Sequence, residues 1–257
     1  MVRETGWVFN NETGAELTLA EFVRSGEQEV GAYLHHFGLE PDVVARSSLV
    51  EIGSGIGRMT AEFSRRFERV TACDLDRHFL ERCERTVADF GEPSRLRTCH
   101  VADGRTLDLP DASADVVFSY ITLQHCQRDD ALALTVEALR VVRPGGTVLL
   151  NYRTWVPADM VLYPAGILVR ALWRVPVVGP RLARQRWSTR LGWQANRLSP
   201  AAVATHLAER GCDLDRAALW FRTVRSTSVP HYETRAFDGI DASHWWLIAR
   251  RADAVRS

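Results

Sequence analysis

The sequence predicts an α/β protein in which a mostly parallel sheet carries helices on both faces. Apolar, strand-like segments alternate with segments of helical periodicity from Leu49 to Leu150, a pattern typical of doubly wound sheets. A turn with three glycines directly follows the first strand-like segment, and carboxylates stand at the ends of the second and third. Since the carboxyl ends of parallel strands meet at one edge of a sheet, these features indicate a ligand site there.

The glycine turn lies in the segment LVEIGSGIGR at residues 49–58. Glycine lacks a Cβ, so it can close a tight turn and leave backbone N–H groups facing a ligand at a helix N-terminus. We expect that helix to open with Arg58 and Met59. A glycine turn alone is a weak signal, but Asp74 ends the next strand, where an acid in a doubly wound sheet meets ribose hydroxyls.

Three further segments continue the alternation. A strand over residues 96–104 ends near Asp103, and a buried strand over residues 115–120 is followed by His125. The turn Arg-Pro-Gly-Gly at residues 143–146 starts a fifth strand. Three apolar stripes at helical spacing indicate core-facing helices between these strands. The stripes are Met59, Phe63 and Phe67, then Phe79, Cys83 and Val87, then Leu132, Val136 and Leu139.

Capping boxes predict helices at the amino terminus. Thr18 and Ser25 are each followed three residues later by Glu or Gln, which predicts two short helices that meet near Ser25 and Gly26, the second ending at Gly38. The alternation breaks after Tyr152. Beyond the break, Ser199 and Pro200 predict a helix that ends at Gly211, and residues 219–224 and 244–249 read as the last two strands.

In this order the motifs closely resemble the class I S-adenosylmethionine-dependent methyltransferases, over roughly Leu49 to Tyr152. The resemblance implies a Rossmann-like fold with a seven-stranded, mostly parallel sheet, an antiparallel last strand, helices on both faces and an inserted helical lid. The predicted organisation has four parts: an N-terminal helical cap at 1–47, a cofactor-binding core at 48–154, an inserted lid or substrate-binding segment at 155–198, and a C-terminal helix and strands at 199–257 that complete the sheet.

The resemblance also implies a set of residues that contact the cofactor. Asp74 would accept hydrogen bonds from both ribose hydroxyls and Asp103 from the adenine amine, while Arg58 would meet the cofactor carboxylate or instead pair with Glu62. The full set is Glu51, Gly53, Ser54, Gly55, Gly57, Arg58, Asp74, Leu75, Asp103, Gly104 and Ser119. S-adenosylmethionine would become S-adenosylhomocysteine, and we expect no metal because the cofactor already carries an activated methyl group.

His125 is the first candidate for a catalytic base, because it follows the fourth strand on the ligand side and its unperturbed pKa suits proton transfer near pH 7. The alternative is that His125 hydrogen-bonds a turn or packs under the lid. His231 with Tyr232 is the second candidate. We expect a hydroxyl acceptor on a small molecule, a sugar or another natural product. Nucleobase amines are disfavoured because residues 119–122 lack the Asn/Asp-Pro-Pro-aromatic motif of such enzymes.

The composition excludes several functions. The 257 residues carry a formal net charge of zero, so nothing global attracts nucleic acid. The chain has no lysine, which excludes a Schiff base, a P-loop lysine and a Tyr/Lys oxidoreductase pair. This bias is typical of GC-rich bacterial genomes. The five cysteines are odd in number and show no metal-type spacing. With no secretory signal and no apolar stretch long enough to span a bilayer, we expect a cytoplasmic, soluble protein.

Several alternatives remain open. The arginines and tryptophans at 173–197 suit a sugar, anionic or lipid-linked acceptor, a contact with an anionic membrane surface, or a lid with solvated arginines. The methyl group could instead go to a carbon or nitrogen of a small metabolite. The glycine turn and the acid also fit an NAD-dependent oxidoreductase or a catalytically inactive cofactor-binding partner subunit. The oligomeric state is not predicted.

Overall fold

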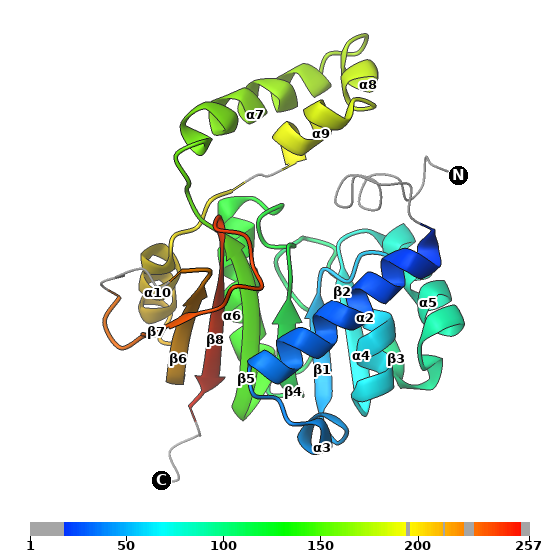
Figure 1. Ribbon diagram of the computed structural model, residues 1–257, viewed down its shortest axis with the longest axis vertical. Helices are drawn as coiled ribbons and strands as arrows, with labels where there is room; N and C mark the ends of the chain where they lie inside the picture. Colours follow the sequence, from blue (N-terminus) through cyan, green and yellow to red (C-terminus); the bar gives the residue numbers. More distant parts are fainter. Residues whose placement is uncertain (1–17, 194–195, 213, 224–228, 253–257) are drawn as a thin grey trace.

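A computed structural model describes residues 18–193, 196–212, 214–223 and 229–252. These residues contain an eight-stranded sheet of order β3-β2-β1-β4-β5-β8-β6-β7 (Figure 1). The strands are β1 (Ser48–Ile52), β2 (Arg69–Asp74), β3 (Leu96–His100), β4 (Ala114–Ser119), β5 (Val142–Arg153), β6 (Leu214–Phe221), β7 (Glu233–Ala236) and β8 (His244–Arg251).

The direction of the strands confirms the predicted topology. β8 is antiparallel to both of its neighbours, β5 and β6, whereas the other paired strands run parallel to one another. The strand order reverses beside β1, which lies between β2 and β4. In open α/β sheets ligands bind beyond the carboxyl ends of the strands at this switch point, and the glycine turn follows β1 there.

Three strand predictions need correction. β7 was not predicted, because it is a four-residue edge strand with little apolar character. The third strand ends at His100 and not near Asp103, so Asp103 lies in the following turn. β6 also begins earlier than predicted, at Leu214, while Val224 lies outside the described residues, as do residues 1–17 of the predicted N-terminal cap.

Helices cover both faces of the sheet, as predicted. α2, α4 and α5 pack on one face, and α6 and α10 on the other (Figure 1). The helices are α2 (Leu19–His36), α3 (Pro41–Val44), α4 (Thr60–Arg66), α5 (Arg77–Phe90), the 3-10 helix η1 (Pro93–Arg95), α6 (Arg128–Val141), α7 (Asp159–Trp173), α8 (Gly179–Leu182), α9 (Arg186–Trp193) and α10 (Pro200–Glu209). α4 thus begins two residues after Arg58, the predicted start.

The prediction of two short helices around Ser25 is wrong, because α2 is continuous. The capping box at Thr18 forms as predicted, with Glu21 N–H donating to the Thr18 hydroxyl and Glu21 accepting from Thr18 N–H. Ser25 caps nothing: its hydroxyl donates to the carbonyl of Phe22 at 2.6 Å, within the helix. Gly26 does not break the helix. Because it has no side chain, α2 can lie directly against the backbone of Arg58 at this position.

This close approach gives a first prediction. We expect Gly26→Ala to destabilise the fold by about 1–3 kcal/mol, since the new Cβ would overlap the carbonyl oxygen of Arg58. Gly31→Ala in the same helix is the matched control. Among the described residues, a Cβ there would meet only Arg66 Nη2, at an ordinary 3.5 Å, so the higher helix propensity of alanine should stabilise the fold by up to about 1 kcal/mol. Urea denaturation measures both; equal effects would contradict the packing of α2 against Arg58.

α7, α8 and α9 stand apart from the sheet, beyond the carboxyl end of β5 (Figure 1). α7 packs on α9 through Gly166, which lies against the backbone of Leu191. Trp173 Nε1 donates to the hydroxyl of Ser188 at 2.9 Å and holds the other end of the pair. Among the described residues, no helix combines the length and the apolar character that crossing a membrane requires.

Candidate cofactor site and acceptor region

The glycine turn is held against the end of β2. The N–H groups of Gly53 and Ser54 both donate to the carbonyl of Cys73, at 2.7 and 3.1 Å. Gly53 has φ +80° and Gly57 has φ +91°, a region that residues with a Cβ rarely adopt. At Gly57 a Cβ would also press on the backbone of Cys83 in α5. The turn therefore needs glycine at both positions.

Asp74 joins this turn from the end of β2. Its Oδ2 accepts from Gly55 N–H at 2.9 Å and its Oδ1 from Asp76 N–H at 2.9 Å. Burial raises the pKa of the Asp74 carboxyl, and these backbone hydrogen bonds oppose the rise. Among the described residues, no atom lies within 4 Å of a Cβ placed on Gly55. In that part of the chain the partly buried acceptor therefore lies beside open space above the turn, which suits a nucleoside.

Glu51 supports the turn from below. It is buried on β1, and its Oε2 accepts from the hydroxyl of Thr60 at 2.6 Å. Burial raises the pKa of Glu51 to about 7, against the opposing effects of the Thr60 hydroxyl and the Arg58 charge. This contact joins β1 to the start of α4, so Glu51 holds the loop between them, and its predicted contact with the cofactor stays a prediction. Ser54 is buried beside Cys83.

The raised pKa of Glu51 predicts a pH dependence of stability. The folded state keeps this proton up to about pH 7, whereas an unfolded Glu loses it near the ordinary value of 4.5. The contribution is therefore full at acidic pH and is lost as pH rises to about 7. Glu51→Gln should remove this decline and change the pH profile by on the order of 3 kcal/mol. Urea denaturation at several pH values measures it; a profile parallel to that of the exposed control Glu68→Gln would contradict it.

Arg58 pairs with Glu29 of α2 and not with Glu62, one of its two predicted partners; the contact with the cofactor carboxylate stays a prediction. Its guanidinium donates to both carboxylate oxygens of Glu29, at 2.9 and 3.1 Å, while Glu62 instead accepts from Arg66. The guanidinium also lies 5.6 Å from the ring centroid of Phe22 and 5.9 Å from that of Tyr120. Arg58 thus ties the N-terminal helix to the glycine turn.

Asp103 lies in the turn after β3, where it organises its own loop. Its Oδ1 accepts from the N–H groups of Arg105 and Thr106, both at 2.8 Å, and Oδ2 accepts from the Thr106 hydroxyl at 2.7 Å. These bonds lower the pKa of Asp103 to about 2. The next residue, Gly104, faces Leu75, which is 61% exposed despite being apolar. An exposed leucine beside a fixed carboxylate suits the flat apolar faces and the amine of adenine.

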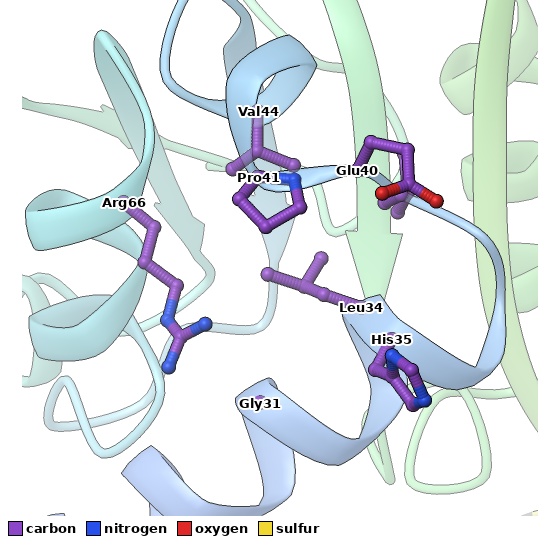
Figure 2. A pocket seen from close by; sticks show the side chains of 8 residues that line it. Gly31, Leu34, His35, Glu40, Pro41, Val44 and Arg66 are labelled. Atoms are coloured by element: carbon purple, nitrogen blue, oxygen red, sulfur yellow. The ribbon is translucent and has the colours of Figure 1, made fainter.

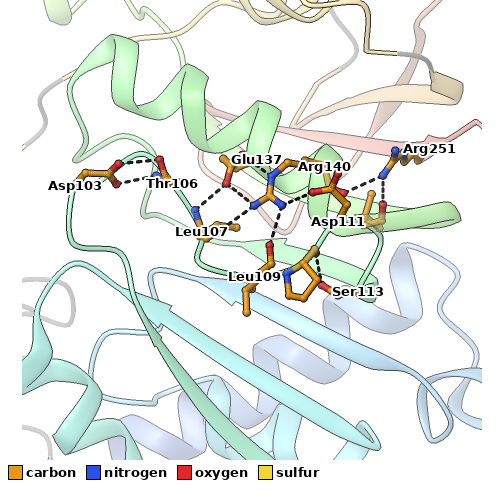
Figure 3. Close-up of polar contacts among 11 residues, drawn as sticks. Asp103, Thr106, Leu107, Leu109, Asp111, Ser113, Glu137, Arg140 and Arg251 are labelled. Carbon is orange, nitrogen blue, oxygen red and sulfur yellow. Dashed lines mark hydrogen bonds and ion pairs between the residues drawn. The ribbon is translucent and has the colours of Figure 1, made fainter.

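A polar network fixes this loop on α6 (Figure 3). The guanidinium of Arg140 donates to the carbonyls of Leu107 and Leu109, both at 2.8 Å, and to the carboxylates of Asp111 and Glu137. Glu137 accepts from Leu107 N–H at 2.8 Å in return. The loop that carries Asp103 is therefore held in place from the α6 side of the sheet, by long-range contacts that no sequence motif predicts.

The segment after β4 approaches the glycine turn from the other side. The hydroxyl of Ser119 is buried and donates to the carbonyl of Ile52 at 3.0 Å, so its side chain joins β4 to β1. Thr122 Oγ1 donates to the carbonyl of Gly53 at 3.3 Å. His125 follows, with its N–H donating to the carbonyl of Thr122 at 2.9 Å. The predicted base thus lies on the loop that touches the glycine turn.

The imidazole of His125 is half-buried and belongs to a chain of polar side chains. Its Nε2 lies 3.4 Å from Gln124 Nε2, and Gln124 Oε1 lies 2.9 Å from His244 Nε2. Burial, together with the charge of Arg153, lowers the pKa of His244 to about 4, so His244 is neutral near pH 7 and can donate to Gln124. This chain orients Gln124 beside His125.

The second candidate base lies elsewhere. His231 and Tyr232 directly precede β7, the outer edge strand, and β5, β8 and β6 separate them from β4. Tyr232 packs against the core cluster on the α6 and α10 face, and burial raises its pKa. The structure therefore does not bring these two residues to the glycine turn or to His125.

A buried ion cluster that was not predicted lies at the start of the predicted lid. Asp159 is fully buried, and its Oδ1 accepts from Arg197 Nη2 at 2.8 Å and from Arg153 Nη2 at 3.5 Å. The guanidinium of Arg197 lies 5.4 Å from the ring centroid of Tyr163. The cluster joins the end of β5, the start of α7 and the segment before α10. One feature of the sequence could have pointed to this cluster: Asp159 is the one acidic residue between Tyr152 and Ser199, in a segment rich in arginine.

A pocket of about 290 Å³ lies at the opposite end of the sheet (Figure 2). Leu34 and His35 of α2, Pro41 and Val44 of α3 and Arg66 of α4 line it. These residues precede β1 or, in the case of Arg66, end α4, so the pocket faces the amino ends of the strands. It is separate from the glycine turn.

The region that contains the glycine turn and Asp74 matches a known protein family. Residues 50–150, which span the glycine turn, Asp74, Asp103 and His125, match the family model described as a methyltransferase domain. This part of the chain is a methyltransferase domain. The methyltransferase domain accounts for β1 to β5, and the matched residues end before α7 and α9.

Curated relatives match about half of the chain or less. An uncharacterized methyltransferase of Mycobacterium tuberculosis is 32% identical over 124 residues, which are 48% of this chain and 59% of that protein. A malonyl-[acyl-carrier protein] O-methyltransferase of Serratia marcescens is 32% identical over 103 residues, which are 40% of this chain and 37% of that protein. The matched region thus spans less than two thirds of these relatives.

Solved structures share the fold of the methyltransferase domain over more of the chain. A methyltransferase of Methanosarcina mazei has a TM-score of 0.57 at 16% identity, covering 86% of this chain and 98% of that one. Magnesium protoporphyrin IX methyltransferase of Synechocystis, solved with bound S-adenosylhomocysteine, has a TM-score of 0.55 at 15% identity, covering 96% and 98%. At these identities the likeness establishes the fold.

Proposed function

We propose that this protein transfers a methyl group from S-adenosylmethionine to a hydroxyl group of a small molecule. The observation that carries the proposal is the contact of the Asp74 carboxylate with Gly55 N–H, at the switch point of a methyltransferase domain. It supports a nucleoside site at the place where this sheet topology binds ligands.

The residues present fit the cofactor. Asp74 offers a partly buried carboxylate for ribose hydroxyls, Gly55 leaves room above the turn, and Leu75 exposes an apolar surface beside Asp103. When bound, S-adenosylmethionine supplies an activated methyl group on its sulfonium for in-line displacement. The chain then has to orient the acceptor, and such alignment supplies up to about 7–11 kcal/mol in intramolecular reactions.

His125 is the proposed general base for a hydroxyl acceptor. A hydroxyl group is a weak nucleophile at neutral pH, so a base that takes its proton as the new bond forms speeds the reaction, typically by about 100- to 10,000-fold. His125 is half-buried on the loop that contacts the glycine turn through Thr122. Gln124, held by His244, can limit the rotation of the imidazole.

This assignment predicts a separation of turnover from binding. We expect His125→Ala to lower kcat by at least about 100-fold and leave the Kd for S-adenosylhomocysteine within about twofold. His231→Ala is the matched control and should keep both values, because His231 lies at the outer sheet edge. Methyl-release kinetics and calorimetry measure the two quantities. A fully active His125→Ala enzyme would remove His125 from catalysis.

The acceptor is proposed to be a sugar or another natural product, with a lipid-linked or anionic compound as the alternative. The segment from α7 to α9 stands beyond the strand ends where the acceptor would enter, and it contributes tryptophan and arginine. Indole rings stack on sugar faces, and guanidinium groups bind carboxylate or phosphate. C- or N-methylation of a small metabolite uses the same cofactor site. The cytoplasmic location stays a prediction.

Titrations with S-adenosylhomocysteine and with NADH, together with a turnover assay, test the function. The protein should bind S-adenosylhomocysteine. It should also convert S-adenosylmethionine to S-adenosylhomocysteine when a pool of hydroxylated metabolites is added. An NAD-dependent oxidoreductase would instead bind NADH and leave S-adenosylhomocysteine unbound, which would contradict the proposal. An inactive partner subunit would bind the cofactor product but show no release with any acceptor pool. That outcome would retain the site and overturn the activity.

A further inference from the structure

The outer surface of α7 is an exposed apolar stripe. Met160, Ile167 and Leu168 are 79%, 49% and 62% exposed, and their spacing puts them near one face of the helix. The apolar surface continues past the end of α7 into the loop before α8, where Val177 is 69% exposed. The full set of large exposed apolar residues in this region is Met160, Val161, Leu162, Ile167, Leu168, Val175, Val177 and Val178. Water-exposed clusters of this kind mark interaction surfaces.

The inner side of α7 is already used. Gly166 and Val169 are buried, and Gly166 lies against the backbone of Leu191 in α9. Arg170 Nη1 donates to the carbonyl of Gly192 at 3.2 Å, and Trp173 Nε1 donates to Ser188. α7 and α9 thus form a packed helix pair, and the apolar stripe lies on the side of α7 that α9 does not cover.

Charge is segregated to the same region. Residues 160–196 contain six arginines and no acidic residue, so this segment carries +6 while the rest of the neutral chain carries −6. Among the arginines, Arg174, Arg181 and Arg184 are exposed at the end of α7 and around α8. Exposed apolar side chains next to clustered arginines are the combination that binds the interface of an anionic bilayer.

We propose that the outer face of α7 and the adjoining loop and α8, called here the docking face, bind peripherally to a membrane surface rich in anionic lipids. The apolar stripe would enter the boundary between headgroups and acyl chains, while the arginines meet lipid phosphates. A second copy of the chain is a poor occupant, because two faces that each carry Arg174, Arg181 and Arg184 repel. Since α7 follows the carboxyl end of β5, docking would bring the acceptor edge of the sheet near the bilayer.

Vesicle flotation tests the docking face. The full chain should float with phosphatidylcholine vesicles that contain about one third phosphatidylglycerol and remain unbound with phosphatidylcholine alone, and about 0.5 M NaCl should weaken the binding. The double variant Ile167→Glu with Leu168→Glu should lower the partition coefficient at least about tenfold, as should Arg174→Glu with Arg181→Glu. Binding of S-adenosylhomocysteine should be unchanged in both, which shows that they are folded.

Matched controls carry the same substitutions at exposed sites elsewhere. Val43→Glu lies in α3, at the amino ends of the strands, and Arg85→Glu lies in α5; both should bind vesicles like the wild type. Wild-type protein that fails to float with anionic vesicles, or floats equally with neutral ones, would overturn the proposal. So would a stable dimer that dissociates in the Ile167→Glu, Leu168→Glu variant. Because flotation needs no methyl transfer, it can fail while the proposed function stands.

Discussion

Replacing Asp74 with alanine is expected to weaken binding of S-adenosylhomocysteine by about 100-fold, which corresponds to roughly 3 kcal/mol. The carboxylate is partly buried at the end of β2, and it accepts from Gly55 N–H at 2.9 Å. Its loss removes a charged acceptor for the ribose hydroxyls and also frees the backbone of the glycine turn. Isothermal titration calorimetry gives the Kd directly.

Two further variants serve as a control and as an intermediate case for Asp74→Ala. Asp89→Ala removes a carboxylate from the exposed surface of α5 and should leave the Kd unchanged. Asp74→Asn keeps an oxygen acceptor for Gly55 but loses the charge, so its Kd should fall between those of the wild type and Asp74→Ala. An Asp74→Ala protein that binds as tightly as the wild type would show that the nucleoside lies elsewhere.

Asp159→Ala is expected to lower the free energy of unfolding by about 3–5 kcal/mol, because it leaves two guanidinium groups without their shared carboxylate. Asp159 is fully buried, and Arg197 and Arg153 have side-chain exposures of 4% and 12%. The cluster joins β5 to the first turn of α7, so the variant should also loosen the segment from α7 to α9. Urea denaturation measures the first effect and limited proteolysis the second.

The control for this variant is Asp238→Ala, an exposed acid in the loop before β8, which should change stability by less than about 0.5 kcal/mol. Adding Arg197→Met to Asp159→Ala removes one of the two buried charges. The double variant should therefore be less destabilised than the sum of the single variants. Strict additivity would contradict the shared-carboxylate account.

The same cluster adds an acid sensitivity. Burial tends to raise the pKa of Asp159, but hydrogen bonds from Arg197 and Val156 N–H and the two guanidinium charges outweigh it and hold the pKa below its usual value. A carboxyl whose pKa is lower in the folded state stabilises the fold above its unfolded pKa. This contribution is lost as the pH falls through the folded value, and the wild type and Asp159→Ala should converge in stability there.

Local sequence patterns are sufficient to predict the core of the fold. β1, β2, β4 and β5 are apolar runs with turn signals at their ends, and the glycine turn and Asp74 lie where the pattern puts them. The continuous α2 is missed because Ser25 and Gly26 carry local signals for a break. What decides there is a contact with Arg58, which lies more than thirty residues away.

The contacts that shape the candidate site are also long-range. Arg58 pairs with Glu29 across 29 residues, Gln124 meets His244 across 120, and Arg197 meets Asp159 across 38. No periodicity or spacing rule encodes such pairs, because each depends on how separate elements dock. The sequence therefore predicts which residues end the strands, whereas only the structure shows which side chains lie within reach of them.

The most direct test is a crystal structure of the protein with S-adenosylhomocysteine. The account predicts that the ribose hydroxyls donate to Asp74, that the adenine lies beside Leu75 with its amine near Asp103, and that the thioether faces the loop carrying His125. Density for the ligand at the opposite end of the sheet, in the pocket between α2 and α3, or a glycine turn that contacts no ligand, would contradict it.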